Sequence, residues 1–387
     1  MTSPRVIHLR SAAEIRAHAG AWDDLWWRGE VALPTVRAEL TAQWIEQFAP
    51  RQALDVIVIE SDGQWVAVLP LILGRRRGII RTAELTANPW SAGGDLLIDP
   101  ECDVPLVAAR LAAEMARLPC AFLWFEEIPL ASARWQALAA AIGEYGLSTA
   151  EHQKYDVVLI DVDGDWGSFE ASRSKNIRQQ SRRRERQLAK LGNLQLVMHT
   201  DFDASELGPV LRRAFEVEDR SWKGAGGSTV LQTPGMFDYF VRQSRSLAEW
   251  GQLVVFMLEL DGRPIAFEYG YSAKGVYFPH KISFDGRYAQ HGPGQVIRRL
   301  RMQRLFETGE HQLVDNLGPV SRADRQWSTR TYPLSRLVVA PRRATSRALL
   351  SLYRAARPAV GRLRARRGDR AQGQPASDSA PPPQLVG

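Results

Sequence analysis

Cysteine is almost absent from this sequence of 387 residues, which contains only Cys102 and Cys120. Two isolated thiols without a metal-binding or redox spacing predict ordinary reduced residues and argue against a disulfide-rich scaffold. Long apolar runs are missing too, since no segment approaches the roughly 20 apolar residues of a membrane-spanning helix. The first residues lack the apolar core of a secretory signal, so we expect a cytoplasmic protein.

Short motifs of several enzyme classes are also absent. Without HExxH or paired CxxC motifs the sequence gives no support to a zinc site, and without GxSxG it gives none to a serine hydrolase. Neither GxGxxG nor GxxxxGKS/T occurs, so dinucleotide and nucleoside-triphosphate folds lose support. We therefore expect no metal.

Lysine is scarce, with only six among 50 Lys+Arg, and the formal net charge is +7. From Arg342 to the end, ten Arg and two Asp give a net charge of +8, which leaves the preceding residues close to neutral at −1. A nucleic-acid-binding protein usually carries its basic charge over the folded body. The distribution therefore argues against nucleic acid as a partner.

One basic segment lies inside the body, at residues 172–192, SRSKNIRQQSRRRERQLAKLG. Its helical spacing gives only a weakly apolar face, which predicts a largely exposed helix. A solvated surface helix is one interpretation. In the other, Arg182, Arg183 and Arg186 attract an anionic acceptor or the phosphates of a coenzyme.

The end of the chain forms a second basic segment. Between about residues 344 and 363, apolar side chains recur at helical spacing among Arg residues, and after Arg370 the composition is too poor in large apolar groups to fold. This pattern predicts either a helix lying on an anionic membrane or a solvated, partly disordered extension.

The sequence contains an internal repeat. Residues 57–67, IVIESDGQWVA, align with residues 256–266, FMLELDGRPIA, and each reads as a strand, an Asp-Gly hairpin turn and a second strand. A helical stretch precedes each hairpin, and a Gly-rich turn and a helix follow it. We predict an α/β (α+β) fold of two tandem units with mixed β-sheets flanked by helices.

The second copy carries the clearest chemical signal. Residues 276–284 predict a strand, and the GPG at 292–294 opens a helix that ends near residue 308. Free N–H groups and the helix dipole favour phosphate at such a helix start, and glycine lets the ligand approach. A plain turn is the alternative. In the first copy, DLLIDP separates Gly93-Gly94 from the next helix, so we expect no phosphate site there.

This order of elements resembles the core of the GNAT acyltransferases. More closely, the chain resembles the duplicated, CelD-like acyltransferases associated with cellulose and exopolysaccharide biosynthesis, which are related to Fem peptidyltransferases. The resemblance covers most of residues 1–340 and is carried by KNIRQQSRRRERQLAKLG (175–192), SWKGAGGST (221–229), the turn and helix at 292–308 and VDNLGPVSRADRQWS (314–328). There are two departures: Gln290 lies one residue closer to the glycines than in the usual Q/R-x-x-G-x-G/A loop, and residues 323–325, ADR, replace a Tyr-Lys pair.

The repeat, the composition of the tail and the resemblance together predict four parts: a degenerate GNAT-like unit (1–168), a basic junction helix (169–192), a second unit with the acyl-CoA site (193–341) and an Arg-rich, partly disordered tail (342–387). It implies an acyl-CoA-dependent N- or O-acyltransferase, with acetyl-CoA as the first choice of co-substrate. The acceptor would be a small-molecule, glycan or lipid-linked precursor of the cell envelope or an exopolysaccharide. The tail would add peripheral contact with the inner face of the membrane.

Two other functions stay open. A Fem-like transferase would take its donor from aminoacyl-tRNA and use the basic helix for it. An accessory protein of a polysaccharide synthase would keep the fold without the activity. Binding of coenzyme A favours the first function, binding of tRNA the second, and binding of neither the third.

Acyl transfer to an amine or hydroxyl needs a base for the acceptor's proton. Glu268, in an otherwise apolar strand, is the first candidate because burial raises a carboxylate's pKa, although strand alternation equally permits an outward side chain. Asp285 is the second candidate, with a turn acid as the alternative. Tyr271 is a candidate proton donor to the thiolate, and His280 a further base. Core packing is an alternative role for both.

The remaining candidates contact the two substrates. By the resemblance, Gln290, Gly292, Gly294 and Gln295 hold the pyrophosphate of acyl-CoA. Trp222 and Lys223 are expected on the acceptor side, because an indole stacks on a sugar or an apolar chain. The alternative is a helix C-terminus, in which Lys223 complements the dipole.

Overall fold

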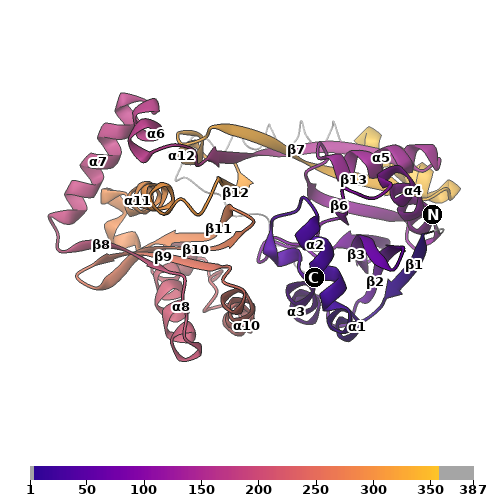
Figure 1. Ribbon diagram of the computed structural model, residues 1–387, viewed down its shortest axis with the longest axis horizontal. Coiled ribbons are helices and arrows are strands. Elements are labelled where there is room, and N and C mark those ends of the chain that lie inside the picture. Colours follow the sequence, from indigo (N-terminus) through magenta and orange to yellow (C-terminus); the bar gives the residue numbers. More distant parts are fainter. Residues whose placement is uncertain (1–3, 357–387) are drawn as a thin grey trace.

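The structure, a computed structural model, describes residues 4–356 and consists of one long mixed sheet with helices on both faces (Figure 1). The strand order is β1-β2-β3-β4-β6-β13-β7-β12-β11-β10-β9-β8, and β5 pairs with β3. The predicted fold class, two tandem α/β units, is confirmed.

The first unit contains the elements of the N-terminal part of the chain. They are β1 (Arg5–Leu9), α1 (Ala12–Ala17), α2 (Ala19–Arg28), η1 (Pro34–Val36), α3 (Ala38–Phe48), β2 (Ala53–Ser61), β3 (Gln64–Arg76), β4 (Ile80–Leu85), β5 (Leu97–Ile98), α4 (Val104–Arg117), β6 (Phe122–Ile128), α5 (Ala133–Glu144) and β7 (Ser148–Asp161). Helices α4 and α5 cover one face of its sheet, and α1–α3 cover the other.

Two helices, α6 (Trp166–Ser172) and α7 (Lys175–Ala189), lead into the second unit. Its elements are β8 (Leu194–His199), α8 (Ala204–Asp219), α9 (Trp222–Ala225), α10 (Met236–Glu249), β9 (Leu253–Leu260), β10 (Arg263–Ala273), β11 (Val276–Phe284), η2 (Gly286–His291), α11 (Pro293–Thr308), β12 (Leu313–Pro319), α12 (Arg322–Arg325) and β13 (Arg330–Ala340). Helices α8 and α10 pack on one face of this sheet, and α11 packs on the other.

The repeated hairpins have matching backbones. Asp62-Gly63 and Asp261-Gly262 make the turns, with φ of 49° and 80° in the first and 50° and 76° in the second. Positive φ at both turn residues is what a two-residue hairpin requires, and Asp-Gly supplies it. In both hairpins the register slips by one residue at the same distance from the turn. The duplication therefore extends to a β-bulge that the aligned letters do not reveal.

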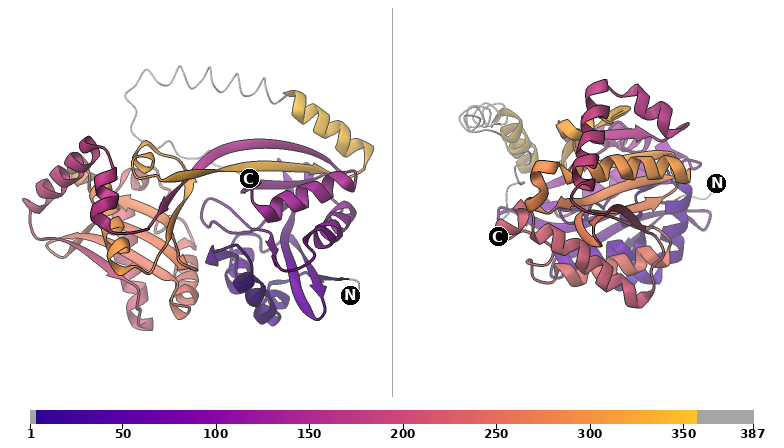
Figure 2. Two further views of the ribbon diagram at one scale, coloured as in Figure 1. Left: turned by 45° about the horizontal axis from the view of Figure 1, so that its top comes forward. Right: turned by 90° about the vertical axis from the view of Figure 1, so that its left-hand side faces the viewer.

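The two units exchange strands. The C-terminal strand β13 lies between β6 and β7 of the first unit, with Leu337 opposite Phe125. On its other edge, the end of β7 pairs with β12 of the second unit, with Asp161 opposite Leu313. Figure 2 shows both strands crossing from one unit to the other. The boundaries at residues 168 and 341 stay predictions, and the sheet is continuous across them.

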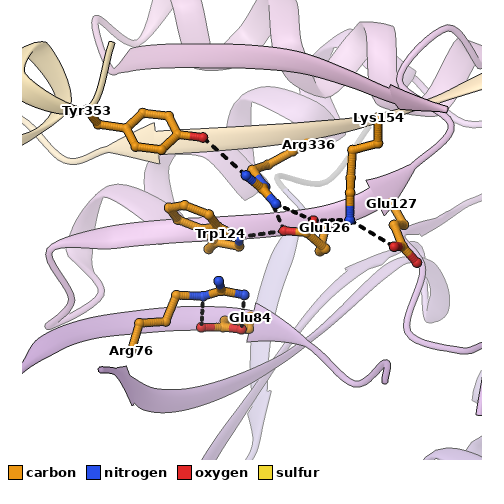
Figure 3. A network of polar contacts seen from close by, with 8 residues as sticks. All are labelled: Arg76, Glu84, Trp124, Glu126, Glu127, Lys154, Arg336 and Tyr353. Atoms are coloured by element: carbon orange, nitrogen blue, oxygen red, sulfur yellow. Dashed lines mark hydrogen bonds and ion pairs between the residues drawn. The ribbon is translucent and has the colours of Figure 1, made fainter. Parts of the chain in front are cut away.

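Ion pairs also join β13 to β6 of the first unit (Figure 3). Arg336 of β13 donates to both oxygens of Glu126 of β6 at 2.6 and 2.7 Å, and Lys154 of β7 donates to Glu127 at 2.8 Å. Burial alone would raise the pKa of Glu126, but hydrogen bonds from Arg336 and Lys154 hold it at about 2. The carboxylate stays charged between the three strands.

Part of the predicted tail is a helix at residues 344–356, which packs on the first unit. Leu350 is 1% exposed, and Tyr353 lies edge-on to Trp124. The remainder of the predicted tail falls on residues 357–387, outside the part of the chain that the structure describes. Within residues 4–356, every helix is too short or too polar to span a bilayer.

Candidate functional site

The turn at residues 292–294 lies where two parallel strands separate. β11 and β12 pair only at Val276–Leu313 and Tyr277–Val314, although both strands continue. Gly292 has φ 62° and precedes α11, and no side chain caps this helix start. Pro293 has no N–H, and the Gln295 N–H bonds the Gly292 carbonyl at 3.0 Å, so the Gly294 N–H is the free donor of this first turn. A free N–H at a helix start is the kind of group that binds an anion. The structure therefore has the predicted strand–turn–helix arrangement.

The basic helix α7 packs beside this turn. A Cβ at Gly292 would lie 2.6 Å from Nη1 of Arg184, so the guanidinium lies against the glycine. The sequence prediction chose Arg182, Arg183 and Arg186 instead. Arg183 and Arg186 are exposed. Arg184 shares its helical face with buried Ser181 and Leu188, and this inward position was the signal that could have identified it.

Ion pairs fix α7 against α11. Glu170 of α6, 3% exposed, accepts from Arg182 and, at 2.9 Å, from Arg299 of α11. Arg299 also donates to Glu185 of α7 at 2.7 Å. Arg182 is thus part of a structural network, and its predicted contact with the acceptor stays untested.

The other predicted coenzyme residues are distributed along the turn. Gly294 and Gln295 lie in the first turn of α11 next to Gly292. Gln290 belongs to the preceding η2, is exposed, and has its amide 3.2 Å from His291. The structure thus brings three of the four together at the helix start.

The corresponding helix of the first unit starts differently. Asp103 caps α4 through a hydrogen bond from Leu106 N–H at 3.1 Å. Gly94 has φ 65°, and a Cβ there would lie 2.6 Å from the backbone nitrogen of Thr86. A carboxylate at the helix start occupies the position of an anion. The expectation that the first unit binds no phosphate stays a prediction.

Glu268 is completely buried beneath α11. Its Oε1 lies 3.1 Å from Nε of Arg301, whose side chain is also fully buried, and accepts from the Tyr277 hydroxyl at 2.8 Å. An ion-paired carboxylate without solvent contact is not positioned to receive an acceptor's proton. The role of Glu268 as the base stays a prediction, and its position favours a structural role.

Asp285 is buried and bridges two arginines, Arg220 at 2.9 Å and Arg287 at 2.7 Å. Burial alone would raise its pKa, but the hydrogen bonds from Arg287 and Arg220 lower it below the ordinary value. Asp285 also caps η2, with Arg287 N–H donating at 3.0 Å. These contacts orient the loop that leads to Gly292, and a lowered pKa makes Asp285 a weak base.

Tyr271 and His280 lie together on the opposite face of the sheet. Tyr271 is fully buried, accepts a hydrogen bond from Gln243 at 3.0 Å, and burial raises its pKa well above the usual value. His280 stacks on it at 5.3 Å, and burial lowers the pKa of His280 to about 3. The histidine is therefore neutral near pH 7; Tyr271 packs in the core, and His280 lies beside it, partly exposed.

Lys223 is brought close to β11. It donates to the Ile282 carbonyl at 3.3 Å and to Glu218 at 3.2 Å. Lys281 of β11 lies 3.9 Å from the same carboxylate, and burial lowers its pKa to about 8. Trp222 is 46% exposed at the start of α9. Two ammonium groups, those of Lys223 and Lys281, thus lie near the same Glu218 carboxylate.

The first unit contributes to this cluster through Trp90. Lys281 lies 4.6 Å from the centre of the Trp90 ring, and His280 Nε2 is 3.0 Å from the Trp90 carbonyl. The loop between β4 and β5, which leads to helix α4 and its capping Asp103, therefore reaches into the second unit. Sequence reasoning missed Lys281 and Trp90, because their proximity depends on contact between the units.

A carboxylate with the properties of a base lies in β12. Asp315 accepts from the Tyr332 hydroxyl and from Leu317 N–H, both at 2.9 Å, and burial raises its pKa to about 6. Leu317 has φ 57°, an uncommon value for a non-glycine residue that often marks a functional site. The sequence analysis included Asp315 only as part of the motif at 314–328. Its apolar neighbours were the signal that could have identified it as a buried acid.

Leu317, two residues after Asp315, and Trp90, which contacts Lys281, lie in the same apolar region. We call Lys223 and Lys281 the lysine cluster. Leu317 and Trp90 both pack against the apolar cluster that contains Phe278 of β11. Asp315 lies on β12 and Lys281 on β11, the two strands that separate. In residues 4–356, no group of three or more His, Cys, Asp or Glu side chains is placed to hold a metal.

Comparison with known proteins is consistent with this geometry. A family model described as an acetyltransferase (GNAT) domain matches residues 175–327, from the start of α7 to just before β13. No curated protein matches the sequence.

Several solved structures resemble the whole chain. The DUF2156 domain of a putative lysylphosphatidylglycerol synthetase from Agrobacterium fabrum is 16% identical, with a TM-score of 0.53 over 88% of this chain and 95% of that one. FemX is 10% identical, with a TM-score of 0.55 over 86% and 96%. A Bacteroides thetaiotaomicron protein of unknown function is 10% identical, with a TM-score of 0.54 over 87% and 100%. At such identities the likeness shows the fold alone. The chain has the GNAT-domain acyltransferase fold, and the CelD-like assignment stays a prediction.

Proposed function

We propose that the protein is an acyl-CoA-dependent N- or O-acyltransferase that acts on a precursor of the cell envelope or an exopolysaccharide. The observation that carries the proposal is the difference between the two helix starts. The start of α11 is uncapped and lies beside Arg184, whereas Asp103 occupies the start of α4. A helix start with an adjacent guanidinium suits the pyrophosphate of acyl-CoA.

In this proposal each group acts on one substrate. The first turn of α11 and Arg184 hold the donor, so that its thioester extends between β11 and β12. Lys223 and Lys281 attract a negatively charged or hydroxyl-rich acceptor on the other side. The acceptor's nitrogen or oxygen attacks the thioester carbonyl, its proton passes to Asp315, and the thiolate leaves.

Titration calorimetry with acetyl-CoA tests the donor. Gly294→Asp places a carboxylate in the first helical turn, and Gly294→Asn is the matched neutral control. A Cβ at Gly294 would meet only the Phe284 ring, at 3.2 Å, and both variants share that contact. We expect the Asp variant to bind at least about tenfold more weakly than the Asn variant.

Equal affinity of the two variants would remove the phosphate site from this turn. Gly94 is unsuitable as the control in the first unit, because any side chain there meets the Thr86 backbone.

The Fem-like alternative is favoured by one observation, the position of basic helix α7 beside the turn. A salt titration of tRNA binding discriminates the two functions. We expect weak binding at about 0.15 M salt, because mobile ions screen a single basic helix there. Submicromolar binding at that salt would promote the tRNA-dependent function, and binding of neither donor would favour the accessory protein.

A further inference from the structure

One end of the first unit is strongly basic. At this end β2, β4, β6 and β7 begin and β3 and β13 end. Eight arginines lie on these ends or in helix 344–356: Arg51, Arg75, Arg77, Arg81, Arg342, Arg343, Arg347 and Arg354. We call this surface the basic end. It lies on the side of the first unit away from the second, at the right of Figure 1.

None of these eight guanidiniums has a carboxylate partner among residues 4–356. Four of them donate only to backbone carbonyls, as Arg347 does to Gly146 at 3.3 Å and Arg343 to Cys120 at 3.4 Å. Arg76, between Arg75 and Arg77 at the end of β3, is an exception that pairs with Glu84, and Arg336 within β13 pairs with Glu126. Placing several arginines without carboxylate partners close together costs free energy through electrostatic repulsion. A bound anion offsets this cost.

An open surface depression lies within the basic end. Its volume is about 510 Å³, and Arg51, Arg75 and Arg81 line it together with Gln52 and Thr82. Guanidinium groups form paired hydrogen bonds with phosphate oxygens, so this lining suits a phosphate group.

Large apolar side chains project from the same surface. Ile79, 79% exposed, lies at the tip of the β3–β4 hairpin, where Arg77 and Gly78 make the turn. Helix 344–356 turns Leu350 inward and leaves Leu352 65% and Leu349 40% exposed. Ile80 packs in the cluster that contains Leu350, so the hairpin tip and the helix are neighbours.

We propose that the basic end docks on an anionic lipid bilayer, with Ile79 and Leu352 entering the interface and the arginines contacting lipid phosphates. Exposed aliphatic side chains bordered by arginines are the pattern of interfacial membrane binding. Charge complementarity selects an anionic bilayer rather than a neutral one. Six further Arg residues follow residue 356 in the sequence.

Cosedimentation of the full chain with vesicles tests the proposal without any substrate, so its outcome is independent of the proposed acyl transfer. We expect binding to phosphatidylcholine vesicles that contain phosphatidylglycerol, and weak binding to phosphatidylcholine alone. Each basic residue near an anionic surface contributes about fivefold to affinity. The triple variant Arg75→Gln, Arg77→Gln, Arg81→Gln should therefore bind about a hundredfold more weakly.

The matched control removes the same charge from the second unit, as Arg245→Gln, Arg263→Gln, Arg304→Gln at three exposed positions. It should bind like the parent. Ile79→Ser should lose roughly tenfold, the effect of withdrawing one large aliphatic side chain from an apolar environment.

Three outcomes overturn the proposal. They are equal losses in the two triple variants, full binding by the variant at positions 75, 77 and 81, and equal affinity for neutral and anionic vesicles. Melting curves of all variants show whether each one is folded.

Discussion

Asp315 is the residue of the candidate site whose pKa is best suited to a general base. Burial raises its pKa to about 6, so the carboxylate is mostly ionised at pH 7 and accepts a proton easily. Because the folded pKa exceeds the ordinary value, ionisation of Asp315 costs folding stability as the pH rises through about 6. The energetic cost and the proposed catalytic use both follow from the same burial.

Replacing this carboxylate tests its role. We expect Asp315→Asn to lower turnover by about a hundredfold or more with little change in acetyl-CoA affinity, and to remove the rise in rate near pH 6. The amide variant should also unfold at a higher temperature than the parent at pH 8, and at a similar temperature near pH 4. Wild-type turnover in a folded Asp315→Asn protein would exclude it as the base.

Tyr332→Phe provides the accompanying control. The Tyr332 hydroxyl lowers the pKa of Asp315 by hydrogen bonding, against the larger effect of burial. Its loss should move the acidic limb of the rate profile to higher pH without abolishing activity. An unchanged limb would show that Asp315 does not set it.

The prediction for Glu268 shows the limit of single-residue reasoning from sequence. Glu268 was singled out as an acid in an apolar strand, but strand alternation left the direction of its side chain open. The structure turns it toward α11, where Arg301 comes from a segment more than thirty residues away. Nothing in residues 265–271 alone distinguishes a core ion pair from a catalytic base.

Among the elements, helix 344–356 has two apolar sides with different roles. Leu350 fits against Phe122, Val338 and Ala340, whereas Leu352 projects outward. The apolar spacing of this segment was visible in the sequence, but which side contacts protein was not.

The two leucines therefore form a matched pair of substitutions. Leu350→Ala should lower the free energy of unfolding by about 2–4 kcal/mol, because a buried leucine leaves a cavity. Leu352→Ala should leave it nearly unchanged, since that side chain is 65% exposed. Denaturant titration of both variants measures the difference. Equal stability would mean that the helix does not pack on the first unit in solution.

For the whole molecule, local patterns predicted the repeated units but not how they join. The hairpins and the turn at 292–294 are each encoded within about thirty residues. The pairing of β13 with β6 joins segments about two hundred residues apart, and neither strand carries a local signal for its partner. The contact between Trp90 and Lys281 could not be predicted for the same reason, because it forms only when the two units pack together.

The shared strands should hold the units together even when the chain is cut. Residues 163–165 between β7 and α6 are exposed, so a specific protease site can be inserted after Asp163. We expect the two fragments to coelute on size exclusion and to separate only in denaturant, because β13 remains between β6 and β7. Separation under native conditions would show that the strand exchange contributes little.

The exchange also sets an order of events during synthesis. β6 is complete at Ile128, but its partner β13 begins at Arg330. At about 5–20 residues per second, a ribosome needs roughly 10–40 s to make the intervening chain. Throughout that interval the nascent first unit has an unpaired strand edge, the kind of edge that promotes aggregation. The protein should therefore depend on chaperones until its last strand emerges, and its N-terminal half should be poorly soluble when expressed alone.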